Sequence, residues 1–382
     1  MEYKLKYQKY KNKYITLKRS LGDDIRNAIF MLCILNDHYV LGACIAAFAH
    51  KQFINILNLN VELVVMCDNY IFDKYNETLY KYFDRVLKIK LRSFDLSDKY
   101  DFIKEKYTWI NYSLSKWECL KYDKYNKILF IDIDILPNNK DFYNLFEFNT
   151  PAFNILSREK ICINSKPFKY KINYTYQQFI ENIVDKIGSI NGAICLLKPS
   201  KETYEKYIEF TDKIYKNGIY SHFITGPDET SLFYFYLKQK INMYDICNDY
   251  TVIPWDMAQL VKGAKAYNFL SWVKPWRKPL FLSWPEEIIW RDIYNIMPHY
   301  GSIEKLFYKT QIKYINEFNK MNLKKKNKYN NLEFEKKYNK EFIDVINSPN
   351  IKNIKILEDK IFFKNYGILD KNKIKNVSQI IM

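Results

Sequence analysis

Glycine and proline are scarce in this chain, with 9 glycines and 11 prolines among 382 residues. Lysine, asparagine, isoleucine, tyrosine and phenylalanine are abundant instead, and all five have A/T-rich codons. This codon bias accounts for much of the lysine excess that gives the chain a net charge of +17. A strongly basic protein can also bind nucleic acid or an acidic surface. The sequence has no arginine-rich block and no nucleic-acid motif, so we expect no nucleic-acid partner.

Paired cysteines are also missing. None of the seven cysteines forms a C-x-x-C pair, which argues against a zinc cluster, because zinc sites show paired spacing. Several cysteines lie inside apolar runs, as is typical of buried, reduced thiols in a cytosolic compartment. The seven are Cys33, Cys44, Cys67, Cys119, Cys162, Cys195 and Cys247.

Long hydrophobic runs are absent as well. No apolar segment is long enough to span a bilayer, and the N-terminus lacks the apolar core of a signal peptide. We therefore expect no membrane span and a cytoplasmic location. The chain is nevertheless 48% apolar, enough to bury a sizeable core. The predicted parts are a basic amphipathic N-terminal helix at 1–24, a globular domain at 25–300 with an insertion at 158–185, and a Lys/Asn-rich C-terminal extension at 301–382.

Predicted strands and helices alternate through the globular domain. The apolar patterns predict strands at 28–35, 61–67, 85–91, 128–131 and 189–197. Helices are predicted at 38–50, 74–83, 109–122 and 201–216. Such alternation predicts an α/β fold with a mostly parallel, Rossmann-like central sheet flanked by helices.

Two aspartates stand at the end of the buried strand 128–131. On a continued strand, the i and i+2 spacing puts Asp132 and Asp134 on the same face. Ligands bind at the carboxyl ends of strands in open α/β sheets. Two adjacent carboxylates repel each other unless a cation lies between them, and hard oxygen ligands favour Mn²⁺ or Mg²⁺. A D-x-D pair alone is a weak signal.

Five further features accompany the D-x-D pair. They resemble the N-D-x-Y, lysine, N-A/S-G, G-G-D-Q and H-F-x-G-x-x-K-P-W motifs of the glycogenin-like family 8 retaining glycosyltransferases, over roughly residues 26–280. The lysine motif is Lys116, 16 residues before Asp132. The others are 36–39 (NDHY), 189–200 (SINGAICLLKPS), 226–229 (GPDE) and 268–276 (NFLSWVKPW).

The resemblance implies a GT-A fold and a hexosyltransferase, which moves a hexose, with glucose favoured, from a UDP-sugar to a protein or glycan acceptor. It implies that Asp132, Asp134 and Asn268 hold Mn²⁺, and that Asp228, Lys274 and Asn191 act in catalysis. The implied donor-binding residues are Asn36, Tyr39, Lys116, Asp132, Asp134, Asn191, Gly192, Asp228, Glu229, Ser271 and Lys274. For Lys116 the alternative is a solvated lysine on a helix, and for Tyr39 it is simple packing.

The chain also departs from the family pattern. Asn268 stands where the family has a metal-binding His, Ser271 replaces a glycine, and Thr225 stands where an Asp often occurs. His222 or His299 could substitute as a ligand, and the alternative for each is a surface or structural histidine. These changes leave open a catalytically inactive protein that binds nucleotide or glycan, or an enzyme that uses UDP-galactose or UDP-N-acetylglucosamine.

The remaining expectations concern partners and source. The segment between Tyr250 and Asn268 is shorter than the loop that glycogenin glucosylates on itself, so we expect an acceptor supplied in trans. A homodimer is expected by analogy with the family. The N-terminal Tyr/Lys segment is similar to leaders on mimivirus-type giant-virus proteins, which points to host cytoplasm or the virion. Sugar stacking or core packing would explain five tryptophans: Trp255, Trp272, Trp276, Trp284 and Trp290.

Overall fold

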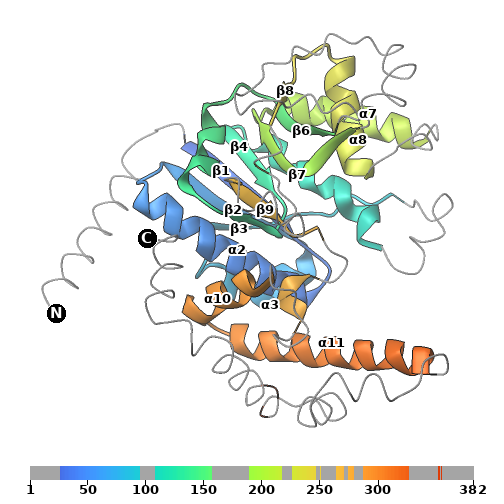
Figure 1. Cartoon of the computed structure of the whole chain (residues 1–382). Helices are drawn as coiled ribbons and strands as arrows, with labels where there is room; N and C mark the ends of the chain where they lie inside the picture. Colours follow the sequence, from blue (N-terminus) through green and yellow to red (C-terminus); the bar gives the residue numbers. More distant parts are fainter. Residues whose placement is uncertain are drawn as a thin grey trace, which may run out of the picture.

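The computed structural model describes most of the globular part of the chain (Figure 1). The described residues are 26–94, 108–156, 189–216, 226–246, 250, 264–270, 274–278, 287–326, 352 and 354. The predicted N-terminal helix at 1–24 and the insertion at 158–185 lie outside these ranges.

A 7-stranded sheet forms the centre of the molecule, in the order β3-β2-β1-β4-β7-β6-β8. The first four strands in this order run parallel to one another, and β7 is antiparallel to both β4 and β6. This confirms the predicted, mostly parallel α/β sheet. The strands are β1 (Arg26–Cys33), β2 (Val61–Cys67), β3 (Arg85–Lys88), β4 (Tyr125–Ile131), β6 (Ala152–Leu156), β7 (Ser189–Leu197) and β8 (Tyr244–Asp245). A second, small sheet pairs β5 (Ile135–Pro137) with β9 (Ala266–Asn268).

Both faces of the sheet are buried, because successive residues of each strand enter different apolar clusters. In β1, Ile29 and Met31 belong to one cluster, whereas Ala28 and Phe30 belong to the other. The first cluster includes side chains of α2 (Asp37–Ile56), α3 (Asn69–Leu79), η2 (Lys140–Glu147), η6 (Pro275–Arg277), α10 (Ile288–Ile296) and α11 (Ile303–Lys326). The second includes side chains of the 3-10 helix η1 (Thr108–Lys121), α7 (Lys201–Lys216) and α8 (Pro227–Lys238).

Most predicted elements are present with shifted ends. The strands at 61–67 and 189–197 and the helix at 201–216 match to the residue. The helix predicted at 74–83 instead begins at Asn69, because the Asp68 carboxylate accepts the Ile71 amide proton at 2.8 Å and caps it there. The segment predicted as a helix at 109–122 is a 3-10 helix.

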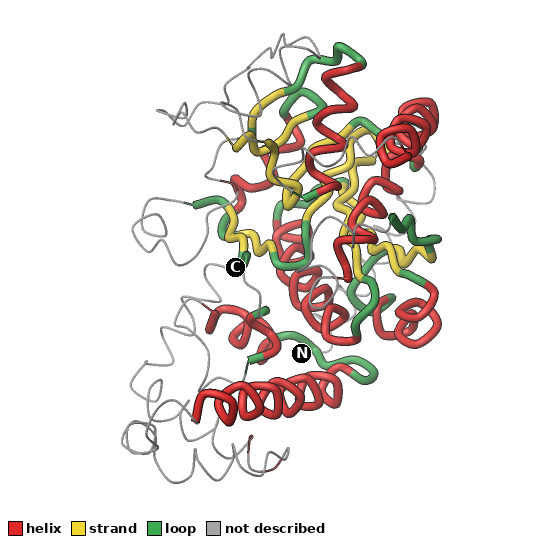
Figure 2. Tube along the Cα trace, turned by 90° about the vertical axis from the view of Figure 1, so that its right-hand side faces the viewer, coloured by secondary structure: helices red, strands yellow, loops and turns green. Residues whose placement is uncertain are grey.

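The folded body continues past residue 300 into the predicted C-terminal extension. Helix α11 contacts α2 and η6, and Ile303, Phe307 and Ile315 are buried in the first apolar cluster. Figure 2 shows α11 as the long helix at the bottom of the view, with the strands above it. At least the first half of this helix is therefore part of the core.

Two expectations drawn from absences agree with the described structure. Its five cysteines, Cys33, Cys44, Cys67, Cys119 and Cys195, are free and buried. In the same residues, no helix combines the length and the apolar character that crossing a membrane requires.

Candidate active site

The two aspartates lie in the turn that joins β4 to β5. Strand β4 ends at Ile131, so the prediction that strand alternation puts Asp132 and Asp134 on one face is wrong. The turn is held by two backbone hydrogen bonds, from Asp132 N to Ala193 O at 2.9 Å and from Ile135 N to Asp132 O at 3.1 Å. Both aspartates nevertheless line the same pocket.

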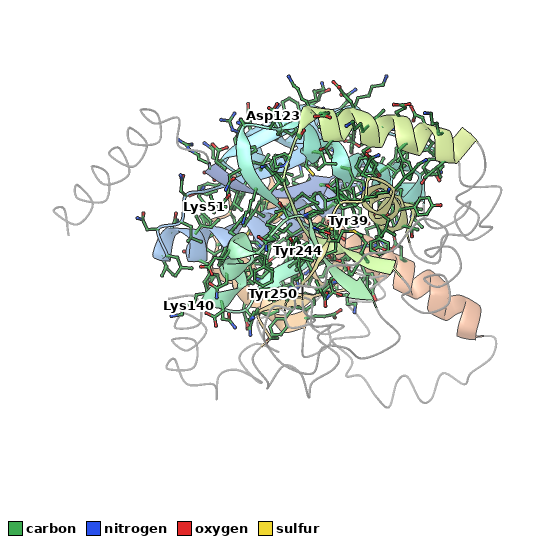
Figure 3. The ribbon with its side chains drawn as sticks, turned by 90° about the horizontal axis from the view of Figure 1, so that it is seen from above. Tyr39, Lys51, Asp123, Lys140, Tyr244 and Tyr250 are labelled. Carbon is green, nitrogen blue, oxygen red and sulfur yellow. The ribbon has the colours of Figure 1, made fainter. Side chains whose placement is uncertain are left out.

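This pocket lies at the carboxyl ends of β1 and β4, where ligands bind in open α/β sheets. Its lining comes from β1 and the turn after it, α2, η1, the turn after β4 and the residue before η6. Figure 3, seen from above, shows Tyr39 of α2 toward the middle of the molecule, whereas Lys51 and Lys140 lie near its edge. The lining residues are Leu32, Ile34, Tyr39, Trp109, Ser113, Lys116, Asp132, Ile133, Asp134 and Lys274.

Lys116 connects the D-x-D turn to α8. Its Nζ lies 3.0 Å from Asp132 Oδ1 and 2.9 Å from Asp228 Oδ2. Burial by itself would lower the pKa of Lys116, but the charges of Asp132 and Asp228 outweigh burial and hold that pKa well above its usual value. Lys116 is buried, so the alternative of a solvated lysine is wrong. Asp228 is fixed further because Trp117 Nε1 donates to its carbonyl oxygen at 3.0 Å.

A second lysine meets the other aspartate. Lys274 Nζ lies 2.5 Å from Asp134 Oδ2, between residues 140 positions apart in the sequence. Burial would lower the pKa of Lys274, yet the Asp134 carboxylate raises it above its usual value. Both lysines therefore remain charged at neutral pH.

Glu229 and Gly192 join α8 to β7. Glu229 accepts the Gly192 amide proton at 2.8 Å and the Gly226 amide proton at 3.2 Å. Burial and the charge of Asp228 raise the pKa of Glu229 to about 7. A Cβ on Gly192 would lie only 2.6 Å from Glu229 Cγ, so the glycine permits this close approach. Next to it, Asn191 Oδ1 accepts the Ala193 amide proton at 2.8 Å.

Carboxyl groups outnumber ammonium groups at this site. Two lysine ammonium groups interact with four carboxyl groups, so the carboxyl groups are in excess. The four belong to Asp132, Asp134, Asp228 and Glu229. Burial, reinforced by Asp134, raises the pKa of Asp132 to about 6 although Lys116 opposes the shift. A bound cation would relieve this repulsion.

Unsatisfied buried atoms mark where such a cation would be held. Asp134 Oδ1 and both polar atoms of the Asn268 side chain are buried without a hydrogen-bond partner, and Asn268 is only 1% exposed. The two residues are neighbours, since Phe269 N donates to Asp134 O at 3.0 Å. Carboxylate and amide oxygens suit Mn²⁺ or Mg²⁺. The described ranges contain no group of three or more His, Cys, Asp and Glu side chains arranged for a metal. Asp132 and Asp134 alone would therefore be too few ligands, and a metal bound to them would need the amide of Asn268 as well.

The comparisons with known proteins agree with this picture. No protein-family model matches the sequence. Human glycogenin-1 is 24% identical over 253 residues, which cover 65% of this chain and 61% of glycogenin-1. An uncharacterised protein of Acanthamoeba polyphaga mimivirus is 24% identical over 257 residues, which cover 64% of this chain and 80% of that protein. The chain is similar to the glycogenin-like family 8 glycosyltransferases.

Its sheet, with a parallel run of four strands followed by an antiparallel strand, has the GT-A type of arrangement. Among solved structures, the galactosyltransferase LgtC, determined with donor and acceptor sugar analogues, has 14% identity and a TM-score of 0.45, over 72% of this chain and 97% of LgtC. The glycosyltransferase GlyE of Streptococcus pneumoniae has 13% identity and a TM-score of 0.44, over 75% of this chain and 63% of that chain. The similarity to the mimivirus protein also agrees with the expected giant-virus source.

The segment 36–39 that resembles N-D-x-Y begins with a strained turn. Asn36 N donates to Ile34 O at 2.8 Å, and Leu35 between them has a φ of +68°, which is unfavourable for a branched side chain. Asp68 stabilises the turn by accepting the Leu35 amide proton at 2.8 Å. The turn leaves Asn36 exposed at the start of α2 and Tyr39 in the pocket lining.

Several predicted residues are not part of the described site. Ser271, His222, Thr225, Trp255, Trp272 and Trp284 lie outside the described residues. His299 does not line the pocket, and its Nε2 lies 2.8 Å from Tyr294 O. Trp276 and Trp290 are buried with ring centroids 4.8 Å apart, so core packing is the correct alternative for both. Tyr250 is buried against Phe142 and Phe148.

The sequence prediction missed five pocket residues, the aliphatic Leu32, Ile34 and Ile133 together with Trp109 and Ser113. Trp109 and Ser113 line the pocket from η1, which also carries Lys116. A signal was available for Ser113, which lies three positions, or one 3-10 turn, before Lys116 and therefore on the same side of the helix.

Proposed function

We propose that this protein is a glycosyltransferase that transfers a hexose, with glucose favoured, from a UDP-sugar to a protein or glycan acceptor, with retention of configuration. The observation that carries the proposal is the convergence of five residues from four separate motifs at one site. Lys116, Asp132, Asp228, Asp134 and Lys274 form two ion-paired groups around a single pocket.

We assign a separate role in the transfer reaction to each side chain of the site. Asp132, Asp134 and Asn268 would hold Mn²⁺ or Mg²⁺, which would supply charge neutralisation for the diphosphate of the donor. Lys274 is buried, charged and next to Asp134, so it would stabilise the negative charge that grows on the leaving diphosphate. Lys116 orients Asp228, which we assign to the side of the transferred sugar together with Asn191.

The decisive experiment measures UDP release from a panel of UDP-sugars with Mn²⁺, with and without a chelator. We expect release that the chelator abolishes and that Asp134→Asn lowers by a factor of about 100 or more, in line with the loss of a group that stabilises transition-state charge. Asp73→Asn is the matched control, because Asp73 is exposed and its ion pair in the described structure is with the exposed Lys88. Wild-type activity in Asp134→Asn would refute the proposed role of this site.

A catalytically inactive nucleotide-binding or glycan-binding protein is the second candidate. It is favoured by Asn268, an amide where the family has a His, and an amide is a weaker ligand than imidazole for Mn²⁺. Calorimetric binding of UDP without turnover of any UDP-sugar or acceptor would support this candidate. Turnover of UDP-galactose or UDP-N-acetylglucosamine in preference to UDP-glucose would instead change the proposed donor.

A further inference from the structure

The indole side chain of Trp109 lines the pocket and is partly exposed to solvent. It lies at the start of η1, is 40% exposed and lines the pocket that contains the charged network. By contrast, Trp117, Trp276 and Trp290 are fully buried in the core. No other aromatic ring of the described ranges stacks on Trp109. A large apolar side chain that is left uncovered in a pocket is a typical ligand contact.

The rest of the pocket lining falls into two chemical kinds. Leu32, Ile34 and Ile133 are aliphatic, and Tyr39 is aromatic. The other lining residues are polar or charged, namely Ser113, Lys116, Asp132, Asp134 and Lys274. One pocket therefore offers surface for a flat, apolar ring and charges for phosphates or a cation.

The position of Trp109 on η1 separates it from the charged network. Trp109 precedes Lys116 by seven positions, which corresponds to about 14 Å along a 3-10 helix. A nucleoside diphosphate likewise has its aromatic base at one end and its phosphates at the other. With phosphates beside Lys116 and Lys274, the base would extend toward the uncharged part of the lining.

We propose that Trp109 stacks on the nucleobase of the sugar donor and contributes to the selection of a nucleotide donor. The proposal rests on the proposed function, since it assumes a nucleoside-diphosphate sugar in this pocket. Stacking of an aromatic side chain on a base needs only the flat face of the ring, so phenylalanine can replace tryptophan in this role but alanine cannot.

The test compares two probes, UDP and inorganic pyrophosphate, by calorimetry in the presence of Mn²⁺ on the full chain. Trp109→Ala is expected to weaken UDP binding roughly tenfold or more and to leave pyrophosphate binding unchanged. Trp109→Phe is expected to retain most of the UDP affinity. Tyr80→Ala is the matched control, because Tyr80 is also an exposed aromatic residue but does not line the pocket.

Three results would overturn the proposal. The first is a Trp109→Ala variant that binds UDP as tightly as the wild type does. This result counts against the proposal even if the variant transfers sugar to an acceptor poorly. The second is an equal loss for UDP and pyrophosphate, which would indicate damage to the charged network. The third is a wild-type protein that binds no UDP, which refutes the proposed function as well, whereas the first two leave the proposed function standing.

Discussion

Two buried lysines determine the charge of the candidate active site. Lys116 pairs with Asp132 and Asp228, and Lys274 pairs with Asp134. These pairs account for the position of each carboxylate, but they do not satisfy Asp134 Oδ1 or the side chain of Asn268. Under the proposed function, a divalent cation would contact these unsatisfied atoms.

Gly192→Ala tests the close approach between β7 and Glu229. The added methyl group would lie 2.6 Å from Glu229 Cγ and 3.4 Å from Asp228 Oδ2, so Glu229 has to leave the Gly192 amide. We expect a loss of about 1–3 kcal/mol in the free energy of unfolding and at least a tenfold loss of UDP release. Combined with Glu229→Ala, the substitution should add almost no further loss, because the clash is gone. If the stability losses of Gly192→Ala and Glu229→Ala instead add up in the double variant, as measured by denaturant titration, this explanation is wrong.

His50 predicts a pH dependence of stability. It lies fully buried on α2, with Nδ1 3.0 Å from the Tyr143 hydroxyl, and burial lowers the pKa of His50 to about 3. The unfolded chain has a histidine pKa near 6.5, so stability is complete above that pH and falls as the pH drops below it. Between pH 7.5 and 5.5 we expect His50 to cost about 1.4 kcal/mol.

Urea unfolding at the two pH values measures this effect. His50→Gln should reduce the pH dependence by that amount. Tyr143→Phe removes the same hydrogen bond but keeps the histidine, so its loss of stability should be similar at both pH values. A pH dependence that His50→Gln leaves unchanged would show that another group is responsible.

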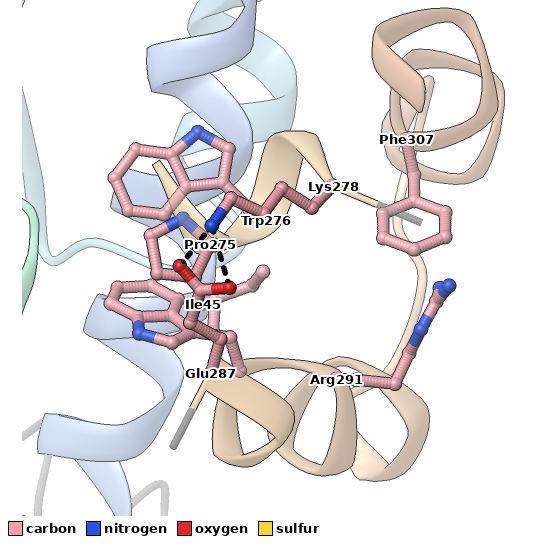
Figure 4. Close-up of a pocket in the computed structure, with 8 residues that line it drawn as sticks. Ile45, Pro275, Trp276, Lys278, Glu287, Arg291 and Phe307 are labelled. Atoms are coloured by element: carbon pink, nitrogen blue, oxygen red, sulfur yellow. Dashed lines mark hydrogen bonds and ion pairs between the residues drawn. The ribbon is translucent and has the colours of Figure 1, made fainter. Parts of the chain in front are cut away.

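At the scale of elements, a buried ion pair ties η6 to the start of α10 (Figure 4). Lys278 Nζ lies 2.6 Å and 2.8 Å from the two oxygens of Glu287, and the side chains are only 7% and 8% exposed. Trp276 and Trp290 line the same small pocket. The pair therefore holds the segment that begins with Lys274 of the active site against the core.

Lys278→Met is expected to lower the free energy of unfolding by about 3–5 kcal/mol, because it removes the ammonium group that faces the buried Glu287 carboxylate. The adjacent pair of Arg277 and Glu317 is the matched control: Glu317 is 44% exposed, so Arg277→Gln should cost at most about 1 kcal/mol. Replacing both Lys278 by Met and Glu287 by Leu should recover much of the loss. Equal effects of the two single substitutions in thermal unfolding would show that burial does not set the strength of the Lys278 pair.

At the scale of the whole molecule, the sheet has an apolar cluster on each face, and α11 completes one of them. Ile303, Leu306, Phe307 and Ile315 are buried there, each contributing about 1.5–3 kcal/mol. Their sum is comparable to the whole stability of a typical domain, about 5–15 kcal/mol. A chain that ends at residue 300 should therefore fail to fold, whereas one that ends at residue 326 should unfold cooperatively in circular dichroism. Cooperative unfolding of the shorter chain would restore a domain boundary at residue 300.

The sequence by itself determined the architecture of this protein. The apolar runs 61–67 and 189–197 form strands of the central sheet. Their alternation with helices leaves few arrangements other than a layered α/β sheet. The resemblance to the glycogenin-like glycosyltransferases, carried by the order of the motifs, also indicated Lys116, Asp132, Asp134, Asp228 and Lys274 as candidates.

Only the tertiary structure decided how those candidates meet. Lys274 contacts Asp134 across 140 positions, and Trp117 contacts Asp228 across 111, because helix packing and strand pairing bring distant segments to one edge of the sheet. The same long-range packing buries Trp276 and leaves Trp109 open in the pocket. A local pattern records whether a residue is apolar or charged, but its partner depends on the free energy of the whole packed chain.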